Sequence, residues 1–211
     1  MDTGNSSSTI PSLDSGFPVD LGLIKNPNTS SNWFLSSRLT SGKYLVTNSD
    51  DQEASSTNVA YDSNTGFSKN QTSNEQGWMW ARGQGFDVVT YTGNGSARQI
   101  PHSLNQVPEM IFTKNRTTDY EWNHYHKGLN GGTNPEQYYL QFTTAAEVQN
   151  SGRWNDQAPT ATHFSIGNHA SVNANNADII AMLFSSVDKI SKVGSYTGSD
   201  STITITTGFQ P

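Results

Sequence analysis

Short apolar runs alternate along this chain with polar segments rich in Gly, Asn, Pro and Ser. The runs are about five residues long, the usual length of a β-strand, and no long stretch has the i, i+3, i+4, i+7 spacing of an amphipathic helix. Two of them, 77–81 and 178–184, are apolar on both faces, which predicts a central strand. The other runs lie at 21–25, 33–35, 43–47, 65–68, 86–91, 110–114, 122–126, 138–142 and 162–167. The pattern predicts an all-β chain, with at most a short helix in the polar stretches 48–62 and 143–162.

The order of these runs repeats. The segment 108–115 (Pro-Glu-Met-Ile-Phe-Thr-Lys-Asn) is echoed at 18–26 (Pro-Val-Asp-Leu-Gly-Leu-Ile-Lys-Asn), and 90–93 (Thr-Tyr-Thr-Gly) returns at 195–198 as Ser-Tyr-Thr-Gly. The period is about 100 residues, which is a domain size rather than the 20 to 50 residues of a solenoid unit. We therefore expect tandem antiparallel β-sandwich modules, jelly-roll-like in character.

The repeat sets the expected boundaries. Residues 1–85 form a first, divergent module, 86–190 a second, and 191–211 the opening strands of a third. Both ends of the sequence fall inside a copy of the repeat, so we expect a piece of a longer array. The final strands are then available to complete the first module or a neighbouring sheet.

Composition narrows the class of partner. Only 14% of the residues are charged and the net charge is −6, so the chain lacks the cationic face that nucleic acids and anionic membranes require. No apolar stretch reaches the length of about 20 residues that spans a bilayer. Cysteine is absent, which excludes disulfides and thiolate chemistry. The composition favours a polar, β-rich surface protein with no nucleic-acid partner and no membrane insertion.

A series of ordered landmarks resembles a repeat of unknown function in large tail or tail-fibre proteins of bacteriophages that infect marine bacteria. The landmarks are 86–95 (Phe-Asp-Val-Val-Thr-Tyr-Thr-Gly-Asn-Gly), 100–104 (Ile-Pro-His-Ser-Leu), 107–111 (Val-Pro-Glu-Met-Ile), Trp122, Tyr125-His126, Pro159-Thr160, Phe164, Gly167, Val172-Asn173 and 193–198 (Val-Gly-Ser-Tyr-Thr-Gly). The resemblance implies a virion component, and no catalytic residue is defined for that repeat.

Candidate chemistry in the sequence is sparse. His124 and His126 share one strand face and can chelate a metal in principle, but no third ligand stands near them in sequence, so we predict no metal site and no cofactor. No Gly-x-Ser-x-Gly elbow and no converging carboxylate pair is present, which argues against an enzyme. Glu53 and Glu147 recur between the modules, and we interpret them as packing or hydrogen-bonding residues.

The best candidate for binding is a loop that carries an aromatic ring among polar groups. Sugar rings stack on Trp while Arg, Asn and Asp bond their hydroxyls, and Arg153, Trp154, Asn155 and Asp156 offer this set. The alternative is that Trp154 covers a small core. Trp33 and Trp122 align between the modules and are expected in the core.

These observations lead to one hypothesis with an alternative. The chain is expected to be a non-enzymatic virion protein, part of a tail fibre or appendage that adheres to a host-surface glycan, assembled in the host cytoplasm with other virion proteins. Trimerisation is expected from tail fibres as a class. The alternative is a capsid decoration protein that binds neighbouring coat subunits. A glycan-degrading tail enzyme would need carboxylates clustered in a groove.

Overall fold

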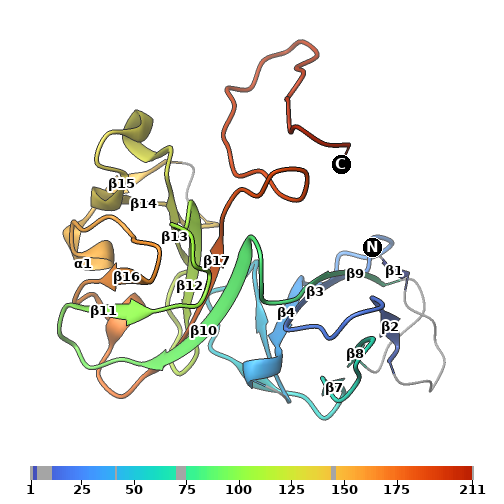
Figure 1. The fold of residues 1–211 in the computed structure, drawn as a ribbon. Coiled ribbons are helices and arrows are strands. Elements are labelled where there is room, and N and C mark those ends of the chain that lie inside the picture. Colours follow the sequence, from blue (N-terminus) through green and yellow to red (C-terminus); the bar gives the residue numbers. More distant parts are fainter. Residues whose placement is uncertain (1, 4–10, 41, 70–74, 144–145, 211) are drawn as a thin grey trace.

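Strands dominate the computed structural model, which describes residues 2–3, 11–40, 42–69, 75–143 and 146–210. They form several antiparallel sheets, none of them closed (Figure 1). The expectation of an all-β, antiparallel chain is thus confirmed. No helix in these ranges is long and apolar enough to cross a membrane. The finer division into tandem sandwiches of about 100 residues stays a prediction.

The first half of the chain, residues 2–85, contains two sheets. The larger has the order β1-β9-β3-β4-β5-β6 and the smaller the order β2-β8-β7. The strands are β1 (Asp2–Thr3), β2 (Leu13–Asp14), β3 (Leu21–Lys25), β4 (Phe34–Ser37), β5 (Lys43–Val46), β6 (Ala54–Ser55), β7 (Val59–Ala60), β8 (Gly66–Lys69) and β9 (Gln76–Trp80), with the 3-10 turn η1 (Arg38–Thr40) between β4 and β5.

The second half, residues 86–190, has a main sheet of order β10-β17-β12-β13 and the pairs β11-β16 and β14-β15. The strands are β10 (Phe86–Thr92), β11 (Arg98–Pro101), β12 (Met110–Asn115), β13 (Asn123–His126), β14 (Tyr138–Tyr139), β15 (Val148–Gln149), β16 (His163–Ile166) and β17 (Asp178–Phe184). The helical turns are η2 (Leu129–Gly132), η3 (Pro135–Gln137), α1 (Ser151–Trp154) and α2 (Ala170–Asn173).

The main sheets of the two halves have the same order over four strands: β1-β9-β3-β4 in one and β10-β17-β12-β13 in the other. Their register agrees as well. Leu21 pairs with Trp80 as Met110 pairs with Phe184, and Leu23 pairs with Leu35 as Phe112 pairs with His124. These are the positions that the echoed segments 18–26 and 108–115 match in sequence.

The outer strands differ between the halves. β10 pairs with β17 at seven positions, from Phe86 opposite Phe184 to Thr92 opposite Asp178. β1 pairs with β9 only at Gly77 and Gln76. In the part of the chain that the structure describes, the backbone of Trp78 to Trp80 therefore has a strand on its β3 side alone.

The described residues form three apolar cores. One lies within the first half, around Leu13, Ile24 and Phe67, and one within the second half, around Ile111, Trp154 and Leu183. The third belongs to both halves. It joins Leu21, Leu35 and Leu45 of the first half to Phe86, Val88, Trp122, Ile180 and Met182 of the second.

Polar contacts reinforce this shared core, and the first-half partners named here lie between Val46, at the end of β5, and Glu53. Lys114 Nζ donates to the carbonyls of Asp50 at 2.9 Å and Tyr120 at 2.6 Å. Arg116 makes a two-pronged ion pair with Glu53, at 2.8 and 3.1 Å. The indole N–H of Trp122 donates to the carbonyls of Val46 and Ser49, both at 3.2 Å. The halves are thus held together by buried, directional contacts as well as by apolar packing.

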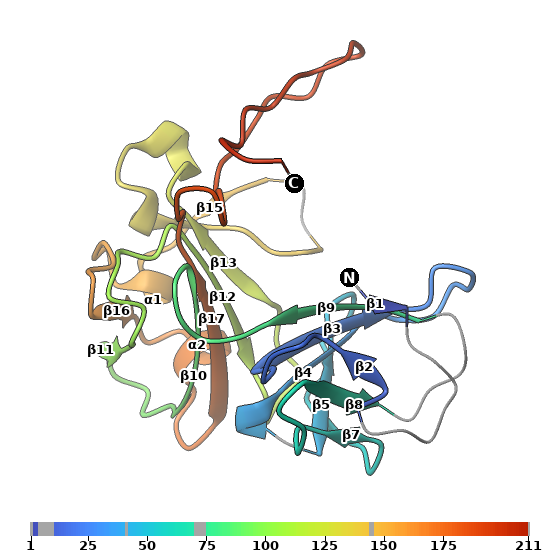
Figure 2. The same ribbon diagram turned by 45° about the vertical axis from the view of Figure 1, so that its right-hand side comes forward.

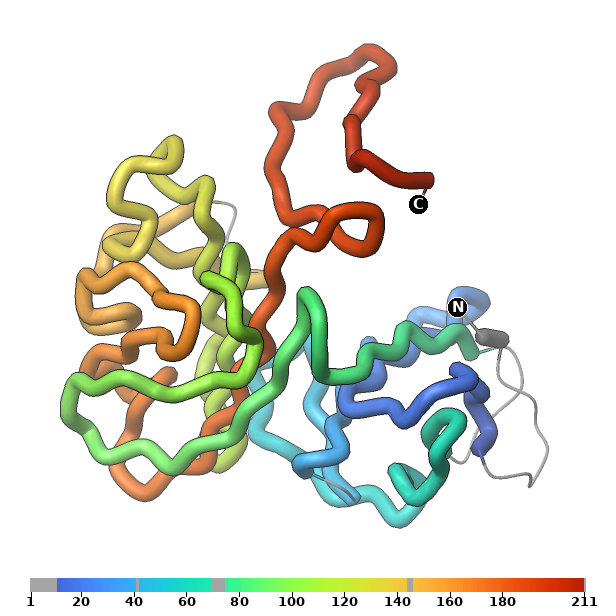
Figure 3. The backbone as a smooth tube through the Cα atoms, viewed as in Figure 1, coloured from blue at the N-terminus to red at the C-terminus, as the bar shows by residue number. Residues whose placement is uncertain are grey.

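The C-terminal arm, residues 194–210, leaves the body after the buried Val193 and projects from it (Figures 2 and 3). It contains neither strand nor helix. The opening strands expected at 191–211 are therefore absent from its described residues, and within this chain the arm completes no sheet. Thr206, Thr207 and Gly208 of the arm line a pocket together with the loop at 186–192. The assignment of 191–211 to a third copy stays a prediction.

Candidate functional site

The structure places the expected glycan-binding loop partly in the interior. Trp154 and Arg153 are each only 2% exposed. The Trp154 ring packs edge-on against Tyr125, with 6.1 Å between centroids, in the core of the second half. The prediction of an exposed aromatic platform is therefore wrong at Trp154, and the alternative, a ring that covers a small core, is the one observed.

Local backbone geometry turns these two side chains inward. Asn150 caps α1 by accepting the Gly152 N–H at 2.8 Å, and Asn155 ends the helix in the left-handed conformation with φ 55°. A single helical turn between these caps directs Arg153 and Trp154 toward the sheet.

Arg153 is held by a polar network rather than free to bind a ligand. Its guanidinium donates to Asn123 Oδ1 at 2.5 Å and to Glu121 Oε1 at 2.6 Å, and it lies over the Tyr139 ring at 4.3 Å. Burial lowers the pKa of Arg153, while Tyr139 and Glu121 oppose that shift. The network joins β13 to α1, and Arg153 Nη1 is buried without a hydrogen-bond partner among the described residues.

Asn155 and Asp156 remain nearer the surface. Asn155 lines a small polar pocket of about 390 Å³ together with Ser96, Ser151 and Asn168, whereas Asp156 is exposed. This pocket has short hydrogen-bonding side chains but no aromatic ring, so the four predicted residues do not form one platform.

An aromatic groove lies between the two halves. Its volume is about 600 Å³, within the range of small-molecule pockets. Both halves line it, with Leu21, Leu23, Trp33, Leu35, Thr47, Asn48 and Trp80 from the first and Met110, Phe112, Trp122, Phe142, Thr143, Met182 and Phe184 from the second. We call this feature the seam groove.

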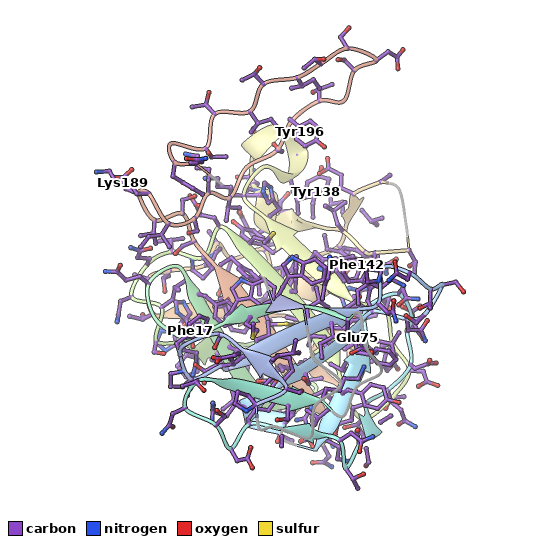
Figure 4. All side chains as sticks on the ribbon, turned by 90° about the vertical axis from the view of Figure 1, so that its right-hand side faces the viewer. Phe17, Glu75, Tyr138, Phe142, Lys189 and Tyr196 are labelled. Carbon is purple, nitrogen blue, oxygen red and sulfur yellow. The ribbon has the colours of Figure 1, made fainter. Side chains whose placement is uncertain are left out.

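The rings of the seam groove are fixed by mutual packing. Trp33 stacks at a tilt on Trp78 with 5.4 Å between centroids, and Trp122 contacts Phe142 at 5.7 Å. Phe142 is 50% exposed and lies below the arm and above the first-half strands in Figure 4. The groove therefore offers solvent-accessible ring surface on a rigid frame.

Three polar residues, Thr47, Asn48 and Thr143, are among those that line the groove. Asn48 accepts the backbone N–H of Trp33 at 2.9 Å and donates to Asn32 Oδ1 at 2.9 Å. These amide and hydroxyl groups can hydrogen-bond a ligand whose apolar face rests on the rings.

His124 lies behind the rings, with its ring centroid 4.0 Å from that of Phe142 and 4.5 Å from that of Phe112. Neither ring nitrogen has a hydrogen-bond partner, and burial lowers its pKa to about 3. His124 is thus neutral at physiological pH. Among the described residues no group of three His, Asp or Glu side chains is placed to hold a metal ion.

The other residues singled out in the sequence have structural roles. Glu53 pairs with Arg116, and Glu147 accepts the Asn130 N–H at 2.7 Å. Trp122 is in the shared core at 1% exposure, as expected. Trp33 is only half-buried and lines the groove. The groove could not be located from the sequence because residues of both halves form it. The aromatic residues at the ends of the aligned strands were the visible signal for such a surface.

A family model described as a domain of unknown function, DUF7483, matches residues 80–211. The chain belongs to this family. The match begins at Trp80, so it contains the whole second half and the arm but leaves β1 to β8 outside. No curated protein and no solved structure matches the chain.

Proposed function

We propose that this chain is a non-enzymatic structural protein of a bacteriophage virion, part of a tail fibre or related appendage, and that it adheres to a host-surface glycan. The ordered landmarks that resemble phage tail proteins supply the setting. Its family membership assigns no activity, so the proposal rests on the sequence resemblance and on the architecture.

The observation that carries the structural part is the agreement between the halves. The order of four strands is the same in both main sheets, β1-β9-β3-β4 in one and β10-β17-β12-β13 in the other. β3 also pairs with β9 in the register in which β12 pairs with β17. We take the halves as two copies of one module. Because the third core and the loop at 46–53 join them, the pair forms a stiff unit, which suits a load-bearing appendage better than a flexible linker would.

The seam groove is the proposed adhesion site. Its exposed rings can stack on the C–H face of a sugar, and Asn48, Thr47 and Thr143 can bond hydroxyl groups. This moves the glycan chemistry from residues 153–156, where Trp154 is buried, to the junction of the halves. The site needs no cofactor.

One observation favours a second candidate function. The groove lining is mostly apolar and includes the polar residues Thr47, Asn48 and Thr143, and an apolar surface rimmed by polar groups also suits protein contact. In that case the protein is a capsid decoration protein, and the groove holds a side chain of a neighbouring coat subunit.

Immunogold electron microscopy on the phage that encodes the chain separates the two. Antibodies raised against the 211-residue protein are expected to label the tail appendages. Labelling of the head would favour the decoration function, and absence from purified particles by mass spectrometry would refute a virion role.

Binding to a glycan array and to host cells tests the groove. Trp33→Ala removes a ring and is expected to weaken glycan binding about fivefold to tenfold, since a stacked ring contributes on the order of 1–1.5 kcal/mol. Trp33→Phe keeps a ring and should retain much of the binding. Tyr138→Ala, on β14 and outside the groove lining, is the control and should bind like the original chain.

A further inference from the structure

We infer that the second half binds a neutral sugar in the polar pocket that Asn155 lines, at a site separate from the seam groove. The pocket has a volume of about 390 Å³, and three segments line it: 95–97 before β11, 151–155 at α1, and 167–168 after β16. α1, β11 and β16 lie on the side of the second half that faces away from the first (Figure 1). The inference therefore depends neither on how the halves meet nor on whether the protein resides in a virion.

A single buried amide holds two of these segments together. Asn173 is fully buried, and its side-chain nitrogen donates to the carbonyls of Ser96 at 2.7 Å and Gly167 at 2.8 Å. Its side-chain oxygen accepts the backbone N–H of Asn94 at 3.0 Å. The loop before β11 is thus fixed against the end of β16.

Backbone contacts hold the third segment, at α1, in place. The Gly167 N–H donates to the Arg153 carbonyl at 2.9 Å, and the Gly152 carbonyl accepts the His169 N–H at 3.0 Å. A Cβ on Gly167 would lie 2.3 Å from the Gly152 carbonyl oxygen, so only glycine permits this approach. The walls are therefore in place before a ligand enters, and binding requires little ordering of the protein.

Four short polar side chains of the lining take no part in this frame. They have no hydrogen-bond partner among the described residues: the hydroxyls of Ser96 and Ser151 and the amides of Asn155 and Asn168. An amide offers two N–H donors and an oxygen acceptor, and a hydroxyl both donates and accepts. The pocket thus presents free donors and acceptors side by side on a fixed frame.

The chemistry of the lining selects the class of ligand. No charged side chain lines the pocket, whereas an anion is usually held by Arg or Lys and a divalent cation by carboxylates. Arg153, which lies between lining residues in the sequence, is turned inward and paired with Glu121. Neighbouring hydroxyl groups of a sugar donate and accept hydrogen bonds as these amides and hydroxyls do, so the complementary ligand is neutral and carries several hydroxyls.

The absence of an aromatic ring from the lining decides how the sugar is held. Without a ring there is no platform for the C–H face, so the hydroxyl groups at one edge of the sugar make the contacts. The terminal hexose of a neutral glycan exposes such an edge. Because each hydrogen bond replaces one made to water, we expect a dissociation constant of about 1–10 mM.

An NMR titration of the full 211-residue chain tests the inference. The ¹⁵N-labelled protein is titrated separately with D-glucose, D-galactose and D-mannose, each to about 50 mM. At least one of them is expected to shift the backbone amide signals of Gly95, Gly152 and Gly167 along a curve that saturates. The side-chain amide signals of Asn155 and Asn168 should follow the same curve.

Two results overturn the inference: none of the three sugars shifts these signals, or the shifts grow linearly without saturation. Shifts confined to the seam groove, at Trp33 and Phe142, would also overturn it while supporting adhesion at the groove. Shifts at the pocket alone would support the inference and count against the groove as the sugar site. The two sites can therefore fail independently.

Asn155→Gly and Asn105→Gly form a matched pair of variants. The two residues have φ 55° and 57°, which glycine adopts freely, so both variants are expected to fold. Asn155→Gly should raise the dissociation constant of the bound sugar about threefold to tenfold, the effect of losing one hydrogen-bonding side chain. Asn105 is exposed and lies outside the lining, so Asn105→Gly should change the constant by less than about twofold.

A second pair tests the space in the pocket rather than its polar groups. Ala97 is exposed and lines the pocket, so Ala97→Leu narrows it without removing a hydrogen-bonding group and should abolish the saturable shift at Gly152. Ala161 is exposed and outside the lining, and Ala161→Leu should leave that shift unchanged. Equal behaviour of the two members of either pair overturns the inference.

Discussion

The central strands of the two halves, β9 and β17, occupy the same place in the sheet order but are enclosed to different extents. β17 has β10 along one side and β12 along the other, and its residues 179–183 are fully buried. β9 has β3 on one side and only two positions of β1 on the other, and its Trp78, Met79 and Trp80 are half-buried. Among the described residues, the same strand order thus encloses β17 on both sides and β9 along its β3 side and at two positions of β1. Substitutions of matched residues should therefore change the free energy of unfolding by different amounts in the two halves.

Trp33 and Trp122 give the largest expected difference. Trp122 fills the shared core and satisfies two carbonyls of the first half, so Trp122→Ala should lower the free energy of unfolding by about 3–5 kcal/mol. Trp33 is half-buried, and Trp33→Ala should cost about 1–2 kcal/mol. Urea unfolding followed by circular dichroism measures both. Equal costs would contradict the view that Trp122 is a core residue and Trp33 a half-buried residue of the seam groove.

His124 stands where the first half has Leu35, opposite Phe112 as Leu35 is opposite Leu23. Burial lowers the pKa of His124 to about 3 from 6.5. As the pH falls below 6.5 the unfolded chain takes up a proton that the folded chain does not, so stability is lost between pH 6.5 and 3. At pH 4 this effect lowers the free energy of unfolding by about 3 kcal/mol. His124→Leu should flatten this part of the stability curve, and a variant with an unchanged acid slope would show that another group is responsible.

Lys25 and Lys114 form the third pair. Burial lowers the pKa of Lys114 to about 8 from 10.5, against the opposing effect of Asp50 and its neighbours. Between pH 8 and pH 10.5 the unfolded chain holds a proton at Lys114 that the folded chain has released. The free energy of unfolding therefore rises as the pH is raised, by about 2 kcal/mol at pH 10. Lys114→Met should remove the rise. Lys25→Met, at the matching place in β3, should keep it when chemical unfolding is compared at pH 8 and pH 10.

Glu53 and Glu147 give the smallest difference. Glu53 is partly buried and accepts both prongs of Arg116, so Glu53→Gln should cost about 1–2 kcal/mol. Glu147 is exposed and accepts one backbone N–H, and Glu147→Gln should cost less than about 0.5 kcal/mol. Thermal unfolding of both variants at neutral pH resolves the two values.

The strands could be predicted because each one carries its own signal. The run 178–184 is apolar on both faces and coincides with β17, and 21–25 coincides with β3. The short helix expected in 143–162 is α1. The second helix, α2, was not predicted, since its four residues are too few for a helical period to show.

The site could not be predicted from local sequence. A lone Trp in a polar loop gives the same signal whether its ring turns in or out, and for Trp154 the caps at Asn150 and Asn155 decide. The seam groove depends on how the halves meet, which is fixed by contacts such as that of Arg116 with Glu53, 63 residues apart in the chain. Recurrence of Glu53 and Glu147 pointed to structural roles but did not identify their partners.

Successive side chains of β17 pack alternately into two different apolar cores. Ile180 and Met182 belong to the core shared with the first half, while Ala181 and Leu183 belong to the core of the second half alone. The residue types at these positions in family members should follow the same division. Family members without a counterpart of residues 2–85 are expected to carry polar residues at positions 180 and 182 and apolar residues at 181 and 183. The even and odd positions of this one strand would then show whether a chain has such a neighbouring half.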